Sequence, residues 1–138
     1  MLVAAGCGGR PEVAPAPETP EATVRQFMSA VSQRNLRAMS ELWGDQRGPA
    51  IRTMNQGELE QRLTIMRQYL QHERYELVVD NMELSVSGDR RTINVRLFRR
   101  GCEPAVPFTL TRYRGGWLIS NVDLGAAGNP QRSCVRRG

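Results

Sequence analysis

The sequence predicts an α+β domain in which N-terminal helices pack on a strongly bent antiparallel β-sheet. In the first half of the chain apolar residues recur at helical spacing, and from Tyr75 onward they alternate with a period of two. Gly115 and Gly116 stand between two alternating stretches, as in a hairpin whose turn needs positive φ values. A run of helices followed by a run of strands is typical of the α+β class.

Three helices are expected before the sheet. The first starts after Thr19, a hydroxyl N-cap, and ends near Asn35, which tolerates the left-handed conformation of a C-terminal cap. The second covers residues 36–43, and the third starts where Asn55 and Glu58 form a capping box. The apolar stripes of the three helices consist of Val24, Phe27, Met28, Val31, Leu36, Met39, Leu42, Trp43, Leu59, Leu63, Met66 and Leu70.

Four long strands are expected after the helices, and residues 50–54 are expected to form a short edge strand. The first long strand covers residues 75–86, and its alternation slips by one residue at Asp80 and Asn81. A β-bulge at that point would bend the strand, as a curved sheet requires. The other three strands are expected at residues 93–98, 106–111 and 117–124.

Composition indicates one small domain with a basic surface. The chain has 138 residues, of which 40% are hydrophobic, and its net charge is +5. Every basic residue is Arg, which binds phosphates and carboxylates in bidentate fashion. An Arg-rich surface that contacts acidic lipid or nucleic acid is therefore an alternative hypothesis, and a solvated outer face is the simpler interpretation. That surface would comprise Arg90, Arg91, Arg96, Arg99, Arg100, Arg112 and Arg114. No nucleic-acid partner is expected, because no aromatic and basic motif is present.

Residues 1–7 resemble the end of a bacterial lipoprotein signal peptide. Ala5 and Gly6 precede Cys7 as the small residues of a lipobox do, although Ala4 stands where Leu is usual and a basic n-region and a full apolar h-region are missing. The resemblance implies lipidation of Cys7 and a membrane-anchored lipoprotein of the bacterial cell envelope, on its periplasmic or extracellular face. An ordinary N-terminus with a chance cysteine is the alternative.

The chain divides into four segments around one folded domain. The signal peptide remnant with its lipobox covers residues 1–7, and residues 8–19 are rich in Pro and Ala, which predicts an extended linker. The domain covers residues 20–124. Residues 125–138 are small and polar and are expected to form a loosely ordered tail.

A disulfide between Cys102 and Cys134 is expected if Cys7 is lipidated. These two cysteines are then an even pair in a compartment where disulfides persist. The bond would close a loop of about 33 residues, which the chain-entropy model values at about 3–4 kcal/mol. Two free thiols in a cytosolic protein are the alternative.

The order of elements and the last strand resemble the nuclear-transport-factor-2-like superfamily, also called the cystatin-like cone. Residues 20–124 carry the resemblance, in which a Gly turn precedes Trp117 and the strand closes with Val122, Asp123 and Leu124. The chain departs from the family at Arg34, where Gly followed by Asp is frequent. The resemblance implies a small bacterial lipoprotein of unknown function with no cofactor, and a possible homodimer formed through the open sheet face.

The resemblance also implies a pocket between the helices and the concave face of the sheet. We expect this pocket to bind a small apolar ligand or an envelope protein without catalysis. The expected lining residues are Trp43, Tyr69, Tyr75, Phe108 and Trp117.

An isomerase or dehydratase that uses the same pocket is the alternative function. Such chemistry needs a base near the substrate and an acid that stabilises an oxyanion. The weak candidates are Asp80, Tyr75 and His72, followed by Asp123 and Tyr69. None of them belongs to a recognisable catalytic motif. One His and two distant Cys do not make a metal ligand set, so no metal site is expected.

Overall fold

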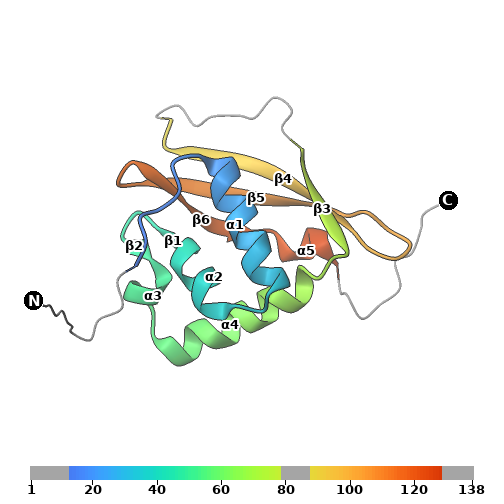
Figure 1. Cartoon of the computed structure of the whole chain (residues 1–138), viewed down its shortest axis with the longest axis horizontal. Coiled ribbons are helices and arrows are strands. Elements are labelled where there is room, and N and C mark those ends of the chain that lie inside the picture. The colour runs from blue at the N-terminus through green and yellow to red at the C-terminus, as the bar shows by residue number, and fades with distance from the viewer. Residues whose placement is uncertain (1–12, 79–87, 129–138) are drawn as a thin grey trace, which may run out of the picture.

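The computed structural model of the protein describes residues 13–78 and 88–128, and in these ranges helices precede a four-stranded antiparallel sheet (Figure 1). The predicted α+β class is therefore confirmed. The strand order is β3-β4-β5-β6. The elements are α1 (Pro20–Ser32), α2 (Leu36–Leu42), β1 (Gly44–Asp45), β2 (Gly48–Pro49), α3 (Ala50–Thr53), α4 (Gln56–Tyr69), β3 (Arg74–Val78), β4 (Arg90–Phe98), β5 (Ala105–Tyr113), β6 (Gly116–Val122) and α5 (Leu124–Ala127).

The hydrophobic core lies between one face of the sheet and the helices that cover it (Figure 1). The predicted alternation in β4 is confirmed, because Ile93, Val95 and Leu97 are fully buried while the residues between them are exposed. Phe108 of β5 faces the same core, and its ring meets Phe27 of α1 edge-on at 6.1 Å between centroids. An edge-to-face pair of this kind is a favourable aromatic geometry.

The predicted starts of the first and third helices are confirmed. The Thr19 hydroxyl accepts a hydrogen bond from the Ala22 N–H at 3.0 Å, and the Asn55 side chain accepts one from the Glu58 N–H at 3.1 Å. Each cap satisfies one of the backbone donors that a helix start leaves without a partner. Local sequence chemistry therefore determines where both helices begin.

The corner between α1 and α2 has a left-handed residue one position earlier than expected. Asn35 has a negative φ and caps the start of α2, so its predicted role as the left-handed residue is wrong. Arg34 takes that conformation with φ +57°. The Asn35 N–H donates to the Ala30 carbonyl at 2.9 Å and the Arg34 N–H to the Val31 carbonyl at 3.1 Å, which is the Schellman pattern. A non-Gly residue in this conformation costs about 1–2 kcal/mol.

The predicted short strand at residues 50–54 is wrong, because α3 occupies this part of the chain. A short apolar stretch cannot be assigned to strand or helix by periodicity alone. The two strands found here, β1 and β2, instead precede α3 and form a small hairpin. Trp43, next to β1, pairs with Ile119 of β6 in a parallel bridge. The hairpin thereby lies beside the β6 edge of the main sheet.

The turn between β5 and β6 uses a different pair of residues from the one predicted. Arg114 and Gly115 have φ values of +48° and +80°, whereas Gly116 already belongs to β6. Two central residues with positive φ are the requirement of a tight hairpin turn. The two strands also change register between Thr109 and Leu110, where Ser120 has no partner in the ladder. A bulge of this kind bends a strand.

Gly116 is needed because the N-terminal segment passes close to its backbone, and not because of the turn. A Cβ atom at this position would lie 2.5 Å from the Ala16 carbonyl oxygen. The N-terminal segment is held there by a hydrogen bond from the Trp117 N–H to the Pro17 carbonyl at 2.9 Å. The end of the segment expected as a linker therefore contacts the edge of the sheet.

The folded part of the chain continues past the predicted boundary at Leu124. Asp123 caps the short helix α5 by accepting a hydrogen bond from the Ala126 N–H at 3.2 Å, and Ala127 is buried. The predicted bulge at residues 80–81 lies outside the described residues. Cys7 and Cys134 lie outside them as well.

Candidate functional site

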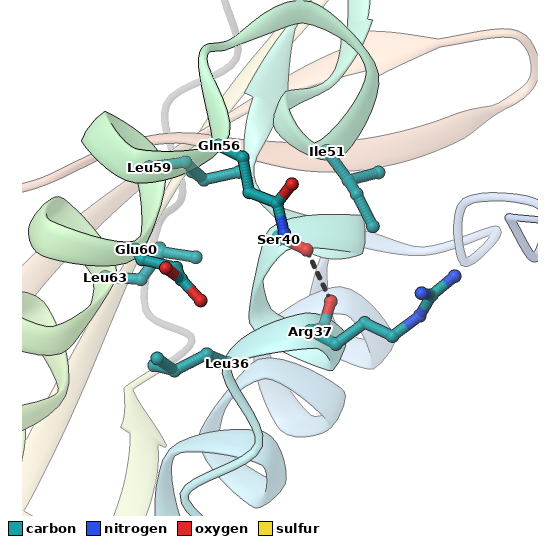
Figure 2. A pocket seen from close by; sticks show the side chains of 8 residues that line it. All are labelled: Leu36, Arg37, Ser40, Ile51, Gln56, Leu59, Glu60 and Leu63. Carbon is teal, nitrogen blue, oxygen red and sulfur yellow. Dashed lines mark hydrogen bonds between the residues drawn. The ribbon is translucent and has the colours of Figure 1, made fainter.

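A pocket of about 410 Å³ lies among α2, α3 and α4. This volume is within the range of small-molecule sites, which is about 300–1,000 Å³. The pocket is lined by Leu36, Arg37, Ser40, Ile51, Gln56, Leu59, Glu60 and Leu63 (Figure 2). We call this set the helix groove.

The apolar part of the helix groove comes from three helices. Leu59 and Leu63 of α4 are one helical turn apart and both are buried, so they form a fixed floor. Leu36 of α2 and Ile51 of α3 are half-buried and remain accessible at the two ends of the groove (Figure 2). An apolar floor with accessible ends suits an elongated apolar group.

The polar lining of the helix groove is balanced in charge. Arg37 and Glu60 contribute one cation and one anion, and Gln56 contributes an uncharged amide. The Arg37 guanidinium is engaged by Glu41 of the same helix, with 3.3 Å between Nε and Oε1. The Ser40 hydroxyl donates to the Arg37 carbonyl at 2.6 Å. Gln56 and Glu60, which have exposed side chains, are the polar groups open to a ligand.

The five residues expected to line a cone pocket are divided between the core and its margin. Trp43, Phe108 and Trp117 are buried, and Phe108 is packed against α1 as described above. Tyr69, at the end of α4, and Tyr75, in β3, are half-buried. The structure thus places three of the five predicted lining residues inside the packed core.

His72 and Tyr75 are the two catalytic candidates that the structure brings together. Their rings meet edge-on at 5.5 Å between centroids. His72 Nδ1 lies 2.8 Å from the Leu70 carbonyl, which can only accept, so Nδ1 carries a proton. His72 Nε2 lies 3.2 Å from the Ser32 hydroxyl oxygen, within hydrogen-bond distance. Asp80 lies outside the described residues, and Asp123 is the α5 cap.

The arginines of the predicted basic surface are divided between the two faces of the sheet. Arg91 is paired with Leu110 on the core-facing side of the sheet, and its guanidinium lies 3.4 Å from the Glu21 carboxylate. Arg96 is five positions further along β4 and therefore faces the outer side. The Arg112 guanidinium lies over the Trp117 ring at 4.8 Å. Several of these side chains therefore have intramolecular partners.

The sequence does not predict the helix groove, although its patterns include three of the eight lining residues. Helical spacing predicts that Leu36, Leu59 and Leu63 lie on the apolar stripes of their helices. An apolar stripe does not show which of its residues line a pocket. Ile51 was assigned to a strand, so the contribution of α3 could not be expected. Only the arrangement of three helices in space reveals the groove.

Residues 13–78 and 88–128 contain neither a membrane-spanning helix nor a cluster of metal ligands. No helix there is long and apolar enough to cross a bilayer. In the same two ranges, no group of three or more His, Cys, Asp or Glu side chains is placed to hold a metal ion.

Comparisons with known proteins add one distant similarity. No family model matches the chain, and no curated protein matches it. Among solved structures, the chain is similar to a crystal structure of a de novo designed protein with a curved β-sheet. The identity is 13%, the alignment covers 75% of this chain and 96% of the designed chain, and the TM-score is 0.44. A similarity at this level identifies no family, ligand or activity.

Proposed function

We propose that this protein is a non-enzymatic binding domain that holds a small apolar ligand, or an apolar segment of an envelope protein, in the helix groove. The observation that carries the proposal is the volume of about 410 Å³ above a floor of leucines from α4. Apolar surface that a ligand can cover gives favourable binding in proportion to its area. Gln56 and Glu60 at the rim would orient a polar end of the ligand.

The proposal includes a nuclear-transport-factor-2-like cone anchored to the envelope through Cys7. Helices that cover one face of an antiparallel sheet, and a register shift between β5 and β6 of the kind that a β-bulge makes, support the cone. The lipobox-like residues before Cys7 support the anchor. In this arrangement the domain binds its ligand while tethered beside a membrane.

Binding of an uncharged apolar probe tests the helix groove. We expect N-phenyl-1-naphthylamine to gain fluorescence with the full chain, because it leaves water for an apolar site. Ile51→Lys puts a cation at one end of the groove and should weaken probe binding at least tenfold. Ile65→Lys is the matched control, because Ile65 is also on the helical layer, is 50% exposed and lies outside the groove. Equal binding by the Ile51→Lys and unaltered proteins would contradict the proposal.

An isomerase or dehydratase remains the second candidate, and the observation that favours it is the contact between His72 and Tyr75. An imidazole whose ring contacts the ring of a tyrosine brings together two side chains that can serve as a base and an acid. Proton exchange at the α-carbon of a set of ketone substrates, followed by NMR in heavy water, tests this function. Exchange that the protein accelerates and that His72→Ala abolishes would establish it.

A further inference from the structure

A second pocket, separate from the helix groove, lies where α1 and α4 end. It has a volume of about 270 Å³ and is lined by Val31, Ser32, Arg34, Arg67, Gln71 and His72. We call these six residues the corner pocket. Two arginines, a histidine, a serine and a glutamine are among its lining residues, and none of the six is acidic. Its lining is therefore rich in hydrogen-bond donors and carries excess positive charge.

Arg34, which lines the pocket, has a left-handed backbone conformation that is unfavourable for a residue with a Cβ atom. Its φ of +57° is at the Schellman position, where Gly is the usual residue because it has no Cβ penalty. Strained positions of this kind cluster at functional sites, and an observed outlier is a reason to look for a function of its side chain. A glycine here would serve the corner equally well, so the side chain is the feature that needs an explanation.

Backbone carbonyls at the helix ends beside the pocket accept hydrogen bonds from donors other than the two arginines. The last carbonyls of α1 accept backbone hydrogen bonds from residues 33–35. At the end of α4, Arg99 donates to the carbonyls of Tyr69 and Gln71, and His72 donates to that of Leu70. Within the described ranges, neither the Arg34 nor the Arg67 guanidinium has an ion pair or a side-chain hydrogen bond.

We propose that the corner pocket binds a phosphate group, held between the guanidinium groups of Arg34 and Arg67 and reached by Ser32 and His72. Arginine presents paired N–H donors in the geometry that phosphate oxygens accept. The Ser32 hydroxyl already lies 3.2 Å from His72 Nε2, so both polar side chains meet at the same point of the pocket. The pocket has room for a substituent on the phosphate. This inference does not depend on the helix groove.

The single histidine of the chain makes the proposal measurable. Inorganic phosphate is titrated into the full chain at fixed pH and ionic strength, and the His72 ring protons are followed by NMR. We expect a saturable shift that an equal ionic strength of chloride does not produce. Arg34→Gly should weaken phosphate affinity at least fivefold, and Arg67→Gln should do the same. The absence of a saturable shift would overturn the proposal.

Arg34→Gly also separates binding from stability. Because it removes a left-handed non-Gly residue, its melting temperature should equal or exceed that of the unaltered protein, so weakened binding cannot be attributed to unfolding. Arg114→Gly is the matched control, since Arg114 has φ +48° and an exposed side chain but lies at the β5–β6 turn. It should keep full phosphate affinity. Equal affinities in the Arg34→Gly and Arg114→Gly proteins would overturn the proposal.

Two further titrations distinguish the sources of the phosphate. Glycerol 3-phosphate represents a soluble ester, and vesicles of phosphatidylcholine with phosphatidylglycerol represent a lipid headgroup. A soluble source predicts that Arg34→Gly weakens glycerol 3-phosphate binding and leaves vesicle binding unchanged. A headgroup source predicts that it weakens vesicle binding. If Arg34→Gly changed neither glycerol 3-phosphate binding nor vesicle binding, the proposal would be overturned. The Ile51→Lys protein should behave like the unaltered chain, which separates this site from the helix groove.

Discussion

Arg99 is the residue that joins the end of β4 to the ends of α4 and α5. Its guanidinium donates to the Gln71 carbonyl at 2.7 Å, to the Ala127 carbonyl at 2.6 Å, and to the Tyr69 carbonyl. One side chain at the end of β4 thereby holds the ends of α4 and α5. Burial lowers the pKa of the Arg99 guanidinium, which still remains protonated at neutral pH.

Replacement of Arg99 by Met should destabilise the fold by about 2–4 kcal/mol. The substitution leaves partly buried carbonyls without donors, and hydrogen bonds from charged groups contribute more than neutral ones. Urea unfolding of the two proteins measures the difference. Arg100→Met is the control, because Arg100 is the exposed neighbour in the same turn. A loss of equal size in both variants would show that charge alone, and not the carbonyl contacts, is responsible.

Asp45 illustrates how a local ion pair supports a small element. Hydrogen bonds from Arg47 lower the pKa of the Asp45 carboxyl below its ordinary value of 3.8. A lowered carboxyl pKa stabilises the fold above the ordinary value, and this stabilisation is lost as the pH falls through the lowered one. We expect the Arg47 amide, which donates to Asp45 at 2.8 Å, to exchange faster with solvent at pH 3 than pH-corrected rates predict. Asp45→Asn should remove this excess.

At the scale of elements, the long strands β4, β5 and β6 and the starts of α1 and α4 could be predicted, whereas the short strands and the corners could not. The burial of Ile93, Val95 and Leu97 follows from alternation, because a strand turns successive side chains to opposite faces. Caps at Thr19 and Asn55 are local signals. In contrast, Arg34 at the α1–α2 corner and Arg114 at the β5–β6 turn take the left-handed conformation, for which arginine has no preference. The helix groove depends on how α2, α3 and α4 meet, which no local pattern specifies.

The contact between the N-terminal segment and β6 predicts the effect of a methyl group at Gly116. Gly116→Ala would place a Cβ 2.5 Å from the Ala16 carbonyl oxygen, so the segment must move away from the strand. We expect a loss of about 1–3 kcal/mol, as overpacking usually costs. Faster amide exchange at Trp117, whose N–H is bonded to Pro17, would locate the change.

Gly57→Ala serves as the control for Gly116→Ala. Gly57 is in the first turn of α4, where a Cβ meets its nearest neighbour at an ordinary 3.4 Å. Alanine is the better helix former, so this variant should gain up to about 1 kcal/mol. A loss of stability in both variants would contradict the steric account of Gly116.

For the molecule as a whole, the predicted disulfide and lipid anchor can be measured together. Intact mass of the membrane fraction should show a chain that begins at acylated Cys7 and gains two mass units on reduction. Cys102→Ser and Cys134→Ser should each destabilise the protein by about 3–4 kcal/mol, because the bond closes a loop of about 33 residues. Free thiols in an unmodified chain that begins at Met1 would contradict both predictions.

The pairing of α1 with β6 determines the order in which the protein can fold during synthesis. The buried Thr23 hydroxyl of α1 donates to the Trp117 carbonyl of β6 at 2.9 Å, across 94 positions of sequence. When α1 leaves the ribosome, the strand that will cover part of its apolar stripe has not yet been translated. A nascent chain that ends before β6 would therefore expose this apolar stripe to chaperones and proteases. Once β6 has been synthesised, the stripe can be buried and is no longer accessible to them.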